Sequence, residues 1–154
     1  MTTESQQAHW SIANLLELFD ARPDGADHFT ADTGIAGEDE RQVVEGTQVL
    51  AQVIVAVAKR FPEKSVRSAH AVFARAVLAG PPVEFDIDVV AEGRSTATAV
   101  VSVSQNGRRA ITVTALLDVP SDDVIRHHLQ RPEVTAPADA NDGSMPMAGR
   151  ELRL

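Results

Sequence analysis

The chain has 154 residues and carries 14 basic against 22 acidic side chains, which gives a formal net charge of −8. This length suits one domain with a sizeable core. The acidic balance disfavours nucleic acids and anionic membranes as partners, because both bind to basic surfaces. The absence of cysteine excludes disulfides, thiolate metal sites and a cysteine nucleophile. Residues 1–9 lack the pattern of a signal peptide, and no apolar run reaches the ~18 residues of a membrane span, so we expect a cytoplasmic protein.

The acidic residues are concentrated in the first third of the chain. Residues 1–48 hold two basic and ten acidic side chains, whereas residues 49–118 hold eight and six. The middle block is therefore the part of the chain where an anionic ligand meets the least electrostatic repulsion.

The first predicted element is a helix over residues 10–20, capped by Ser11. Its apolar residues recur at helical spacing, namely Ile12, Leu15, Leu16 and Phe19. Beyond it, residues 28–31 are expected to form a short edge strand, since proline and glycine punctuate the chain around them. Residues 37–42 are polar and predict a loop.

A long apolar segment over residues 46–60 is the most informative part of the sequence. Gln52 is the only polar residue within 49–58, which predicts an element that is buried on all sides. The β-branched residues would also suit a strand. The length of the segment, its alanines and the two cations at its end favour a helix, and Pro62 is expected to end it.

After Pro62 the hydrophobic pattern changes to a period of two, which predicts four strands. They are expected over residues 66–77, from residue 83, over residues 95–104 and over residues 109–119. Glu92-Gly93-Arg94 predicts one turn, and Asn106-Gly107 is a strong hairpin signal. An antiparallel sheet wrapped around a buried helix satisfies both patterns. This is the hotdog arrangement, a subclass of the α+β class.

These elements predict a single hotdog domain over residues 1–120, with a central helix at about 46–60. Residues 121–131 are expected to form a short helix, because polar residues can cap its start and basic residues suit its end. The two adjacent histidines in this segment would point about 100° apart, so no metal site is predicted. Residues 132–154 have a composition typical of a flexible tail.

The start of the central helix offers backbone N–H groups that have no helical partner. Gly46, Thr47 and Gln48 supply them, and the glycine allows a carbonyl group to approach the main chain. The helix dipole would further polarise such an oxygen. Glu45 precedes these amides, where it is either a charge that suits the dipole or a general base.

Three further polar residues have two interpretations each. Gln48 and Gln52 share one face of the helix, and amide groups on an apolar helix cost free energy unless they are hydrogen-bonded. They either bond the backbone of neighbouring strands or a partner subunit, or orient substrate and water. His70 shares a strand face with Ser68 and Val72. It is either structural or a general base, because histidine readily exchanges protons near neutral pH.

Two segments together resemble the N-terminal half of type II acyl-CoA thioesterases, which are double-hotdog enzymes. The family pattern Gly-Gly-Gln-Val-x-x-Gln has its counterpart in Gly46-Thr47-Gln48-Val49-Leu50-Ala51-Gln52. The pattern Ser-x-His-x-x-Phe-x-Arg has its counterpart in Ser68-Ala69-His70-Ala71-Val72-Phe73-Ala74-Arg75. Residues 93–95 and 107–115 continue the likeness, which covers roughly residues 10–120. Thr47 replaces the second glycine, and Ala76-Val77 stand where the family has Pro-Gly.

The resemblance implies hydrolysis of an acyl thioester on coenzyme A or on an acyl carrier protein, with no cofactor beyond the carrier itself. It places the family's catalytic aspartate, with its threonine and glutamine partners, in the C-terminal half of such enzymes. The expected central helix holds no acidic residue. Either a second chain supplies the acid, or Glu45 and His70 have taken over its role, or the domain binds without hydrolysing.

We expect the thioester carbonyl at the amides of residues 46–48, with Gln48 and Gln52 orienting water or substrate. The pantetheine arm would then pass Gly93, Arg94 and Ser95. A lone sheet of five strands leaves its edges open, so a homodimer or a higher hotdog oligomer is expected. Two other functions stay open. One is addition of water or another nucleophile to an α,β-unsaturated acyl thioester, and the other is acyl binding as the non-catalytic half of a hetero-oligomer.

Overall fold

The computed structural model describes residues 12–34, 42–122, 125, 127–143 and 152–153. The predicted capping residue Ser11 and most of the predicted loop over residues 37–42 lie outside the described residues. The chain divides into two units, Leu16–Ser121 and the terminal segments that flank it.

The central helix α2 spans Gly46–Arg60, as predicted. One side of it is buried, through Val49, Gln52, Val53, Ala56 and Val57. The opposite side is exposed at Thr47, Ile54 and Ala58. The prediction of a helix buried on all sides is therefore wrong for the single chain, because the sheet leaves one side of α2 uncovered.

Six antiparallel strands form one sheet in the order β1-β2-β4-β5-β6-β3. The strands are β1 (Arg22–Pro23), β2 (His28–Ala31), β3 (Ser65–Phe73), β4 (Val83–Glu92), β5 (Thr96–Gln105) and β6 (Arg108–Asp118). The sheet has one strand more than predicted, because β1 pairs with β2. This pairing also corrects the prediction that residues 28–31 lie at an edge, and the edges are β1 and the longer β3.

Strand β3 is shorter than the predicted strand over residues 66–77. Its pairing with β6 ends at Phe73, which lies opposite Ile111. The N–H groups of Ala74 and Arg75 then both donate to the carbonyl oxygen of Ala110, at 2.9 and 3.0 Å. Two successive donors to one acceptor break the ladder, so the chain leaves the sheet at this point.

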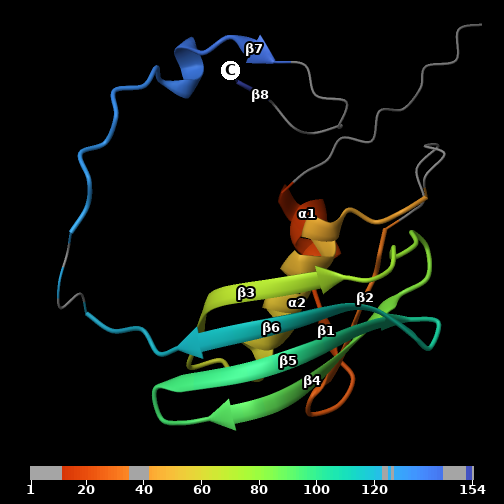
Figure 1. Cartoon of the computed structure of the whole chain (residues 1–154). Coiled ribbons are helices and arrows are strands. Elements are labelled where there is room, and N and C mark those ends of the chain that lie inside the picture. Colours follow the sequence, from red (N-terminus) through yellow and green to blue (C-terminus); the bar gives the residue numbers. More distant parts are fainter. Residues whose placement is uncertain (1–11, 35–41, 123–124, 126, 144–151, 154) are drawn as a thin grey trace, which may run out of the picture. The chain divides into compact units, whose positions relative to one another are not determined.

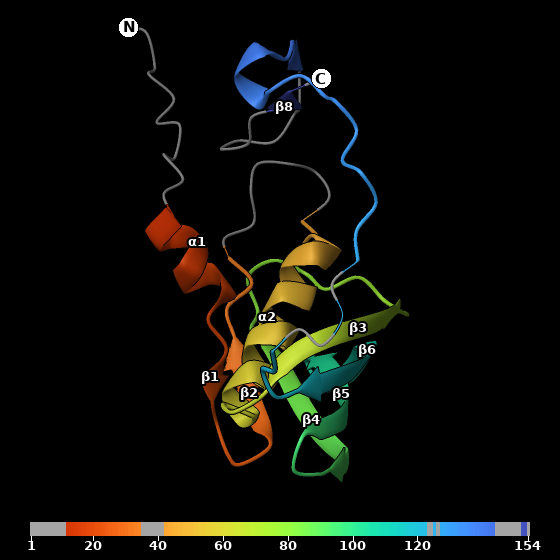
Figure 2. The same ribbon diagram turned by 90° about the vertical axis from the view of Figure 1, so that its left-hand side faces the viewer.

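Alternate residues of the long strands form the core. In β5 every second residue from Ala97 to Gln105 is buried. In β4 the buried apolar residues alternate with the exposed Glu84, Asp86 and Asp88, as the period of two predicted. The sheet curls around α2, as Figures 1 and 2 show from two directions. This is the predicted hotdog arrangement of the α+β class.

The turn between β5 and β6 is also the predicted one. Asn106 and Gly107 have φ angles of 54° and 71°, a left-handed conformation that these two residue types tolerate well and that tight hairpins require. The turn places Gln105 opposite Arg108, and the pairing shifts by one residue between Ser104 and Val103.

Outside the sheet, α1 spans Ile12–Phe19, within the predicted helix over residues 10–20. No described residue of the segment 121–131 is helical, so the predicted short helix is wrong for that part. Ile125 and Leu129 are 86% and 85% exposed. A short helix with no apolar face to bury is unstable in water, which explains the difference.

The predicted tail over residues 132–154 contains local structure. Pro137–Asp139 forms one turn of 3₁₀ helix, and β7 (Asp142–Gly143) pairs with β8 (Leu152–Arg153). Its flexibility stays a prediction. Among the described residues, no helix combines the length and the hydropathy needed to cross a membrane.

Candidate functional site

The N-terminus of α2 presents two backbone donors. Glu45 occupies the N-cap position with extended backbone, and its side chain makes no capping hydrogen bond. The N–H of Gln48 donates to the carbonyl oxygen of Glu45 at 3.0 Å, so it is already used within the first turn. Of the three amides that the sequence singled out, those of Gly46 and Thr47 precede the first helical hydrogen bond and can serve an incoming oxygen.

Phe73 lies against Gly46. A Cβ atom on Gly46 would lie 2.9 Å from Cε1 and 3.2 Å from Cζ of the Phe73 ring, and the shorter distance would force the ring to shift. The glycine therefore leaves room for an aromatic ring of the same chain, and not only for an approaching ligand as the sequence suggested. The ring itself is 52% exposed.

A cleft of about 300 Å³ lies beside these two residues. It is lined by Val44, Gly46, Val49, Phe73, Ala74, Arg75, Ala76, Val77 and Ile111. Val49, Val77 and Ile111 are each at least 97% buried and form an apolar floor. The N–H of Val44 donates to the carbonyl oxygen of Val77 at 2.8 Å, which ties the segment before α2 to the segment after β3. An apolar floor beside backbone donors suits an acyl group attached to a carbonyl.

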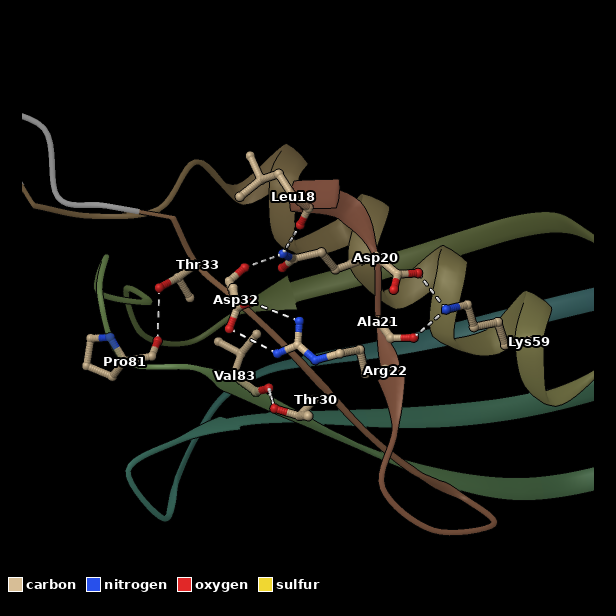
Figure 3. Close-up of polar contacts among 11 residues, drawn as sticks. Leu18, Asp20, Ala21, Arg22, Thr30, Asp32, Thr33, Lys59, Pro81 and Val83 are labelled. Atoms are coloured by element: carbon tan, nitrogen blue, oxygen red, sulfur yellow. Dashed lines mark hydrogen bonds and ion pairs between the residues drawn. The ribbon is translucent and has the colours of Figure 1, made fainter. Parts of the chain in front are cut away.

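Gln48 and Gln52 hydrogen-bond to the backbone, which is one of the two alternatives that the sequence left open. Nε2 of Gln52 donates to the carbonyl oxygens of Leu18 and Asp32, both at 2.7 Å. Figure 3 shows both contacts as dashed lines to the labelled Leu18 and Asp32. Nε2 of Gln48 donates to the carbonyl oxygen of Thr33 at 3.2 Å. Oε1 of Gln52 is buried and has no hydrogen-bond partner.

These bonds continue into the connection between β3 and β4. The hydroxyl of Thr33 donates to the carbonyl oxygen of Pro81 and accepts from the N–H of Gly80, both at 2.9 Å. The amide group of Gln105 donates to the carbonyl oxygens of Leu78 and Pro81, both at 2.8 Å. Residues 74–77 of the same connection line the cleft, where backbone hydrogen bonds to Ala110 and from Val44 hold them. Thr33 and Gln105 carry no sequence signal for this role.

The structure does not bring Glu45 and His70 together within one chain. Ala69 and Ala71 pack against the core, so His70, between them on β3, points to the opposite face of the sheet. His70 is exposed and lies opposite the exposed Thr114 of β6. His70 shares this exposed face with Ser68 and Val72, as the alternation along the strand predicted.

Gly93, Arg94 and Ser95 lie far from the amides of Gly46 and Thr47. They form the exposed turn between β4 and β5, next to the C-terminal end of α2, where Arg60 and Glu92 are 3.9 Å apart. A helix of 15 residues is about 21 Å long. One chain therefore separates the predicted carbonyl site and the predicted pantetheine site by the whole length of α2.

Asp32, whose carbonyl oxygen accepts from Gln52, forms an ion pair through its side chain. The guanidinium of Arg22 donates to both carboxylate oxygens of Asp32, at 2.8 and 3.0 Å (Figure 3). This hydrogen bonding lowers the pKa of Asp32 and raises that of Arg22. Among the described residues, no group of three or more His, Cys, Asp or Glu side chains is arranged to hold a metal ion.

Comparison with solved structures identifies similar folds. The chain spans about half the length of each of the following three structures. A tesB protein of Mycobacterium avium subsp. paratuberculosis has a TM-score of 0.74 at 18% identity, covering 84% of this chain and 50% of that one. The acyl-CoA thioesterase II TesB2 of Mycobacterium marinum has a TM-score of 0.70 at 22% identity, covering 82% and 47%. A hot dog fold protein from Alicyclobacillus acidocaldarius has a TM-score of 0.72 at 20% identity, covering 87% and 50%.

Comparison with curated protein sequences finds no match. A family model described as the acyl-CoA thioesterase N-terminal domain matches residues 39–118. The matched segment contains α2, the cleft and strands β3 to β6. Because it makes up more than half of the 154 residues, the chain belongs to the family of acyl-CoA thioesterase N-terminal domains.

Proposed function

We propose that this domain hydrolyses an acyl thioester carried on coenzyme A or on an acyl carrier protein. Besides the family membership, one observation supports the proposal. Gly46, at the start of α2, lines a cleft with an apolar floor, and the amides of Gly46 and Thr47 precede the first hydrogen bond of the helix. A thioester has a carbonyl oxygen that needs donors and an acyl chain that needs an apolar surface, and this cleft offers both side by side.

The proposed reaction begins with the thioester carbonyl accepting hydrogen bonds from the N–H groups of Gly46 and Thr47. Glu45 takes a proton from water, and the water oxygen bonds to the carbonyl carbon. The negative charge that develops on the carbonyl oxygen is stabilised by the two amides and by the helix dipole. The bond between carbon and sulfur then breaks, the thiolate takes up the proton, and the acid and the free thiol leave. Oε1 of Gln48 is the group on α2 that would orient the water.

The proposal includes pairing with a second copy of the chain. Strand β3 is a long edge strand, and its outer row of backbone groups has no neighbouring strand in the sheet. The uncovered side of α2 includes Ile54, which is 38% exposed. A partner hotdog that continues the sheet at β3 would cover both. In such a pair the partner would contribute residues to the cleft.

The test is release of free thiol from a series of acyl-CoA and acyl-pantetheine thioesters by the wild type, Glu45→Gln and His70→Ala. Glu45→Gln keeps the shape and loses the basicity, so turnover should fall about 10²–10⁴-fold. His70 lies on the face of the sheet that points away from the core. His70→Ala should therefore leave turnover per folded molecule unchanged. Full turnover in Glu45→Gln would refute Glu45 as the base.

The absence of an acidic residue within α2 supports one alternative, acyl binding without hydrolysis. In that case a non-hydrolysable acyl-CoA thioether would bind to the wild type, while no thioester would release thiol. A wild type that neither binds nor hydrolyses would refute both functions.

A further inference from the structure

The floor of the cleft is closed by residues of the chain itself. Val49, Val77 and Ile111 form this floor and are each at most 3% exposed. The next inward-facing residues of the same helix and strand, Val53 on α2 and Val113 on β6, are at most 1% exposed. Protein interiors are close-packed and hold few voids, so an acyl chain that enters the cleft ends at this floor. A partner subunit that covers the mouth of the cleft cannot deepen it.

The volume of the cleft limits the length of the chain that it can hold. The cleft measures about 300 Å³. A dry cavity of about 150 Å³ holds one molecule of benzene, so this cleft has room for about twelve non-hydrogen atoms. The sulfur and the carbonyl oxygen of a thioester take two of these places, which leaves room for an acyl group of at most about ten carbons.

Val77 belongs to a segment whose backbone is held on both sides, in the connection that follows β3 (Figure 1). The carbonyl oxygen of Val77 accepts from the N–H of Val44 at 2.8 Å. The N–H of Leu78 donates to Oε1 of Gln105 at 2.9 Å, and the carbonyl oxygen of Leu78 accepts from Nε2 of Gln105 at 2.8 Å. These bonds keep the side chain of Val77 in the floor. They also oppose collapse of the backbone when that side chain is shortened, so a shorter side chain leaves a deeper cleft.

Position 77 is also a place where the chain departs from the thioesterase-like pattern. Ala76-Val77 follow Arg75, whereas the pattern has Pro-Gly there. Glycine has no side chain, so the isopropyl group of Val77 fills space that a glycine leaves open. The backbone of Val77 lies outside the left-handed region, so a valine is accommodated there without strain.

We propose that Val77 determines the longest acyl chain that the cleft accepts, and that this chain has about ten carbons or fewer. This inference rests on the proposed function and specifies the acyl group of its substrate. Each methylene that is buried against the apolar lining strengthens binding about fourfold. Methylenes beyond the limit gain nothing, because they stay in water. The logarithm of kcat/KM, plotted against chain length, should therefore rise and then break at this limit.

The test measures kcat/KM for straight-chain acyl-CoA thioesters from acetyl to palmitoyl. Val77→Ala removes two methyl groups from the floor and should move the break about two carbons toward longer chains. Val77→Ile adds one methyl group and should move the break about one carbon toward shorter chains. Val77→Ile keeps the branched apolar side chain, so it should fold even if Val77→Ala does not. Opposite shifts in the two variants are not expected from a residue that only supports the fold.

Val57→Ala is the matched control. Val57 is also a fully buried valine. It lies on the buried side of α2, eight residues or about 12 Å beyond Val49, and does not line the cleft. The control removes the same atoms from the core as Val77→Ala does, and its break should stay at the length found for the wild type.

The outcomes separate this inference from the proposed function. If no thioester releases thiol, the proposed hydrolysis fails, and the affinities of non-hydrolysable acyl-CoA thioethers then locate the break. A break in those affinities that moves in the Val77 variants supports the inference without hydrolysis. The inference is overturned by a wild-type kcat/KM or affinity that rises through palmitoyl, by an unmoved break in the Val77 variants, or by an equal shift in Val57→Ala. Absence of both binding and hydrolysis overturns the inference together with the proposed function.

Discussion

The ring of Phe73 occupies the space where a side chain on Gly46 would lie, with Cε1 only 2.9 Å from the position of such a Cβ atom. This contact joins the last residue of β3 to the first residue of α2 and closes one side of the cleft. Gly46 and Phe73, which belong to two separate segments of the thioesterase-like pattern, are therefore in steric contact.

Gly46→Ala should destabilise the fold by about 1 kcal/mol, because the added methyl group must displace the Phe73 ring. Chemical denaturation measures this change. Gly93→Ala is the control, since its Cβ would lie 3.6 Å from the carbonyl oxygen of Thr96, an ordinary contact. In a Phe73→Ala background the cost of Gly46→Ala should vanish. A cost that persists there would show that something other than the ring requires the glycine.

Gln52→Met should destabilise the fold by about 2 kcal/mol, because the two short hydrogen bonds from the buried Gln52 to the carbonyl oxygens of Leu18 and Asp32 are lost. Removing the unpartnered Oε1 offsets part of this loss. Gln48→Met is the matched comparison and should cost about 0.5–1 kcal/mol, since a single longer hydrogen bond from a partly exposed side chain is lost. If urea titrations show the same loss of unfolding free energy for both variants, Gln52 does not contribute more to stability than Gln48.

Asp32→Asn should lower stability at neutral pH by at most about 1 kcal/mol, because the pair with Arg22 is exposed to solvent. Hydrogen bonding from Arg22 lowers the pKa of Asp32 in the folded state. Its contribution is therefore complete above the ordinary aspartate pKa of about 3.9 and is lost as the pH falls through the lowered folded value. The stabilities of wild type and variant should converge at acidic pH, and a difference that grows there would contradict this account.

Ser68→Lys/Val72→Lys should convert a dimer into a monomer if β3 pairs with a second copy, since lysines at a sheet edge oppose edge-to-edge pairing. Both positions are exposed on the outer face of β3, so the fold should persist, as circular dichroism can check. Leu116→Lys is the control, because Leu116 lies opposite Ser68 on the neighbouring strand β6, away from the edge. Sedimentation of the wild type as a monomer at micromolar concentration would refute the pairing.

The local sequence determined the elements of this domain. The apolar run over residues 49–58, interrupted only by Gln52, and the cations that follow it predicted α2 with its observed bounds. The period of two predicted the start of β4 and both ends of β5 and β6 to within one or two residues. Asn106-Gly107 predicted the turn between β5 and β6. These features depend on neighbours within a few residues, through backbone conformation and the periodicity of side chains.

The tertiary structure decided which of these residues meet. Alternation along β3 separates His70 from Ala69 and Ala71, but only the pairing with β6 determines which face is buried, because small alanines suit either face. The partners of Gln52 lie 20 and 34 residues away in the chain, and the ring against Gly46 comes from another strand. Contacts of this kind depend on how helix and sheet pack together, and no local pattern of side chains encodes that geometry.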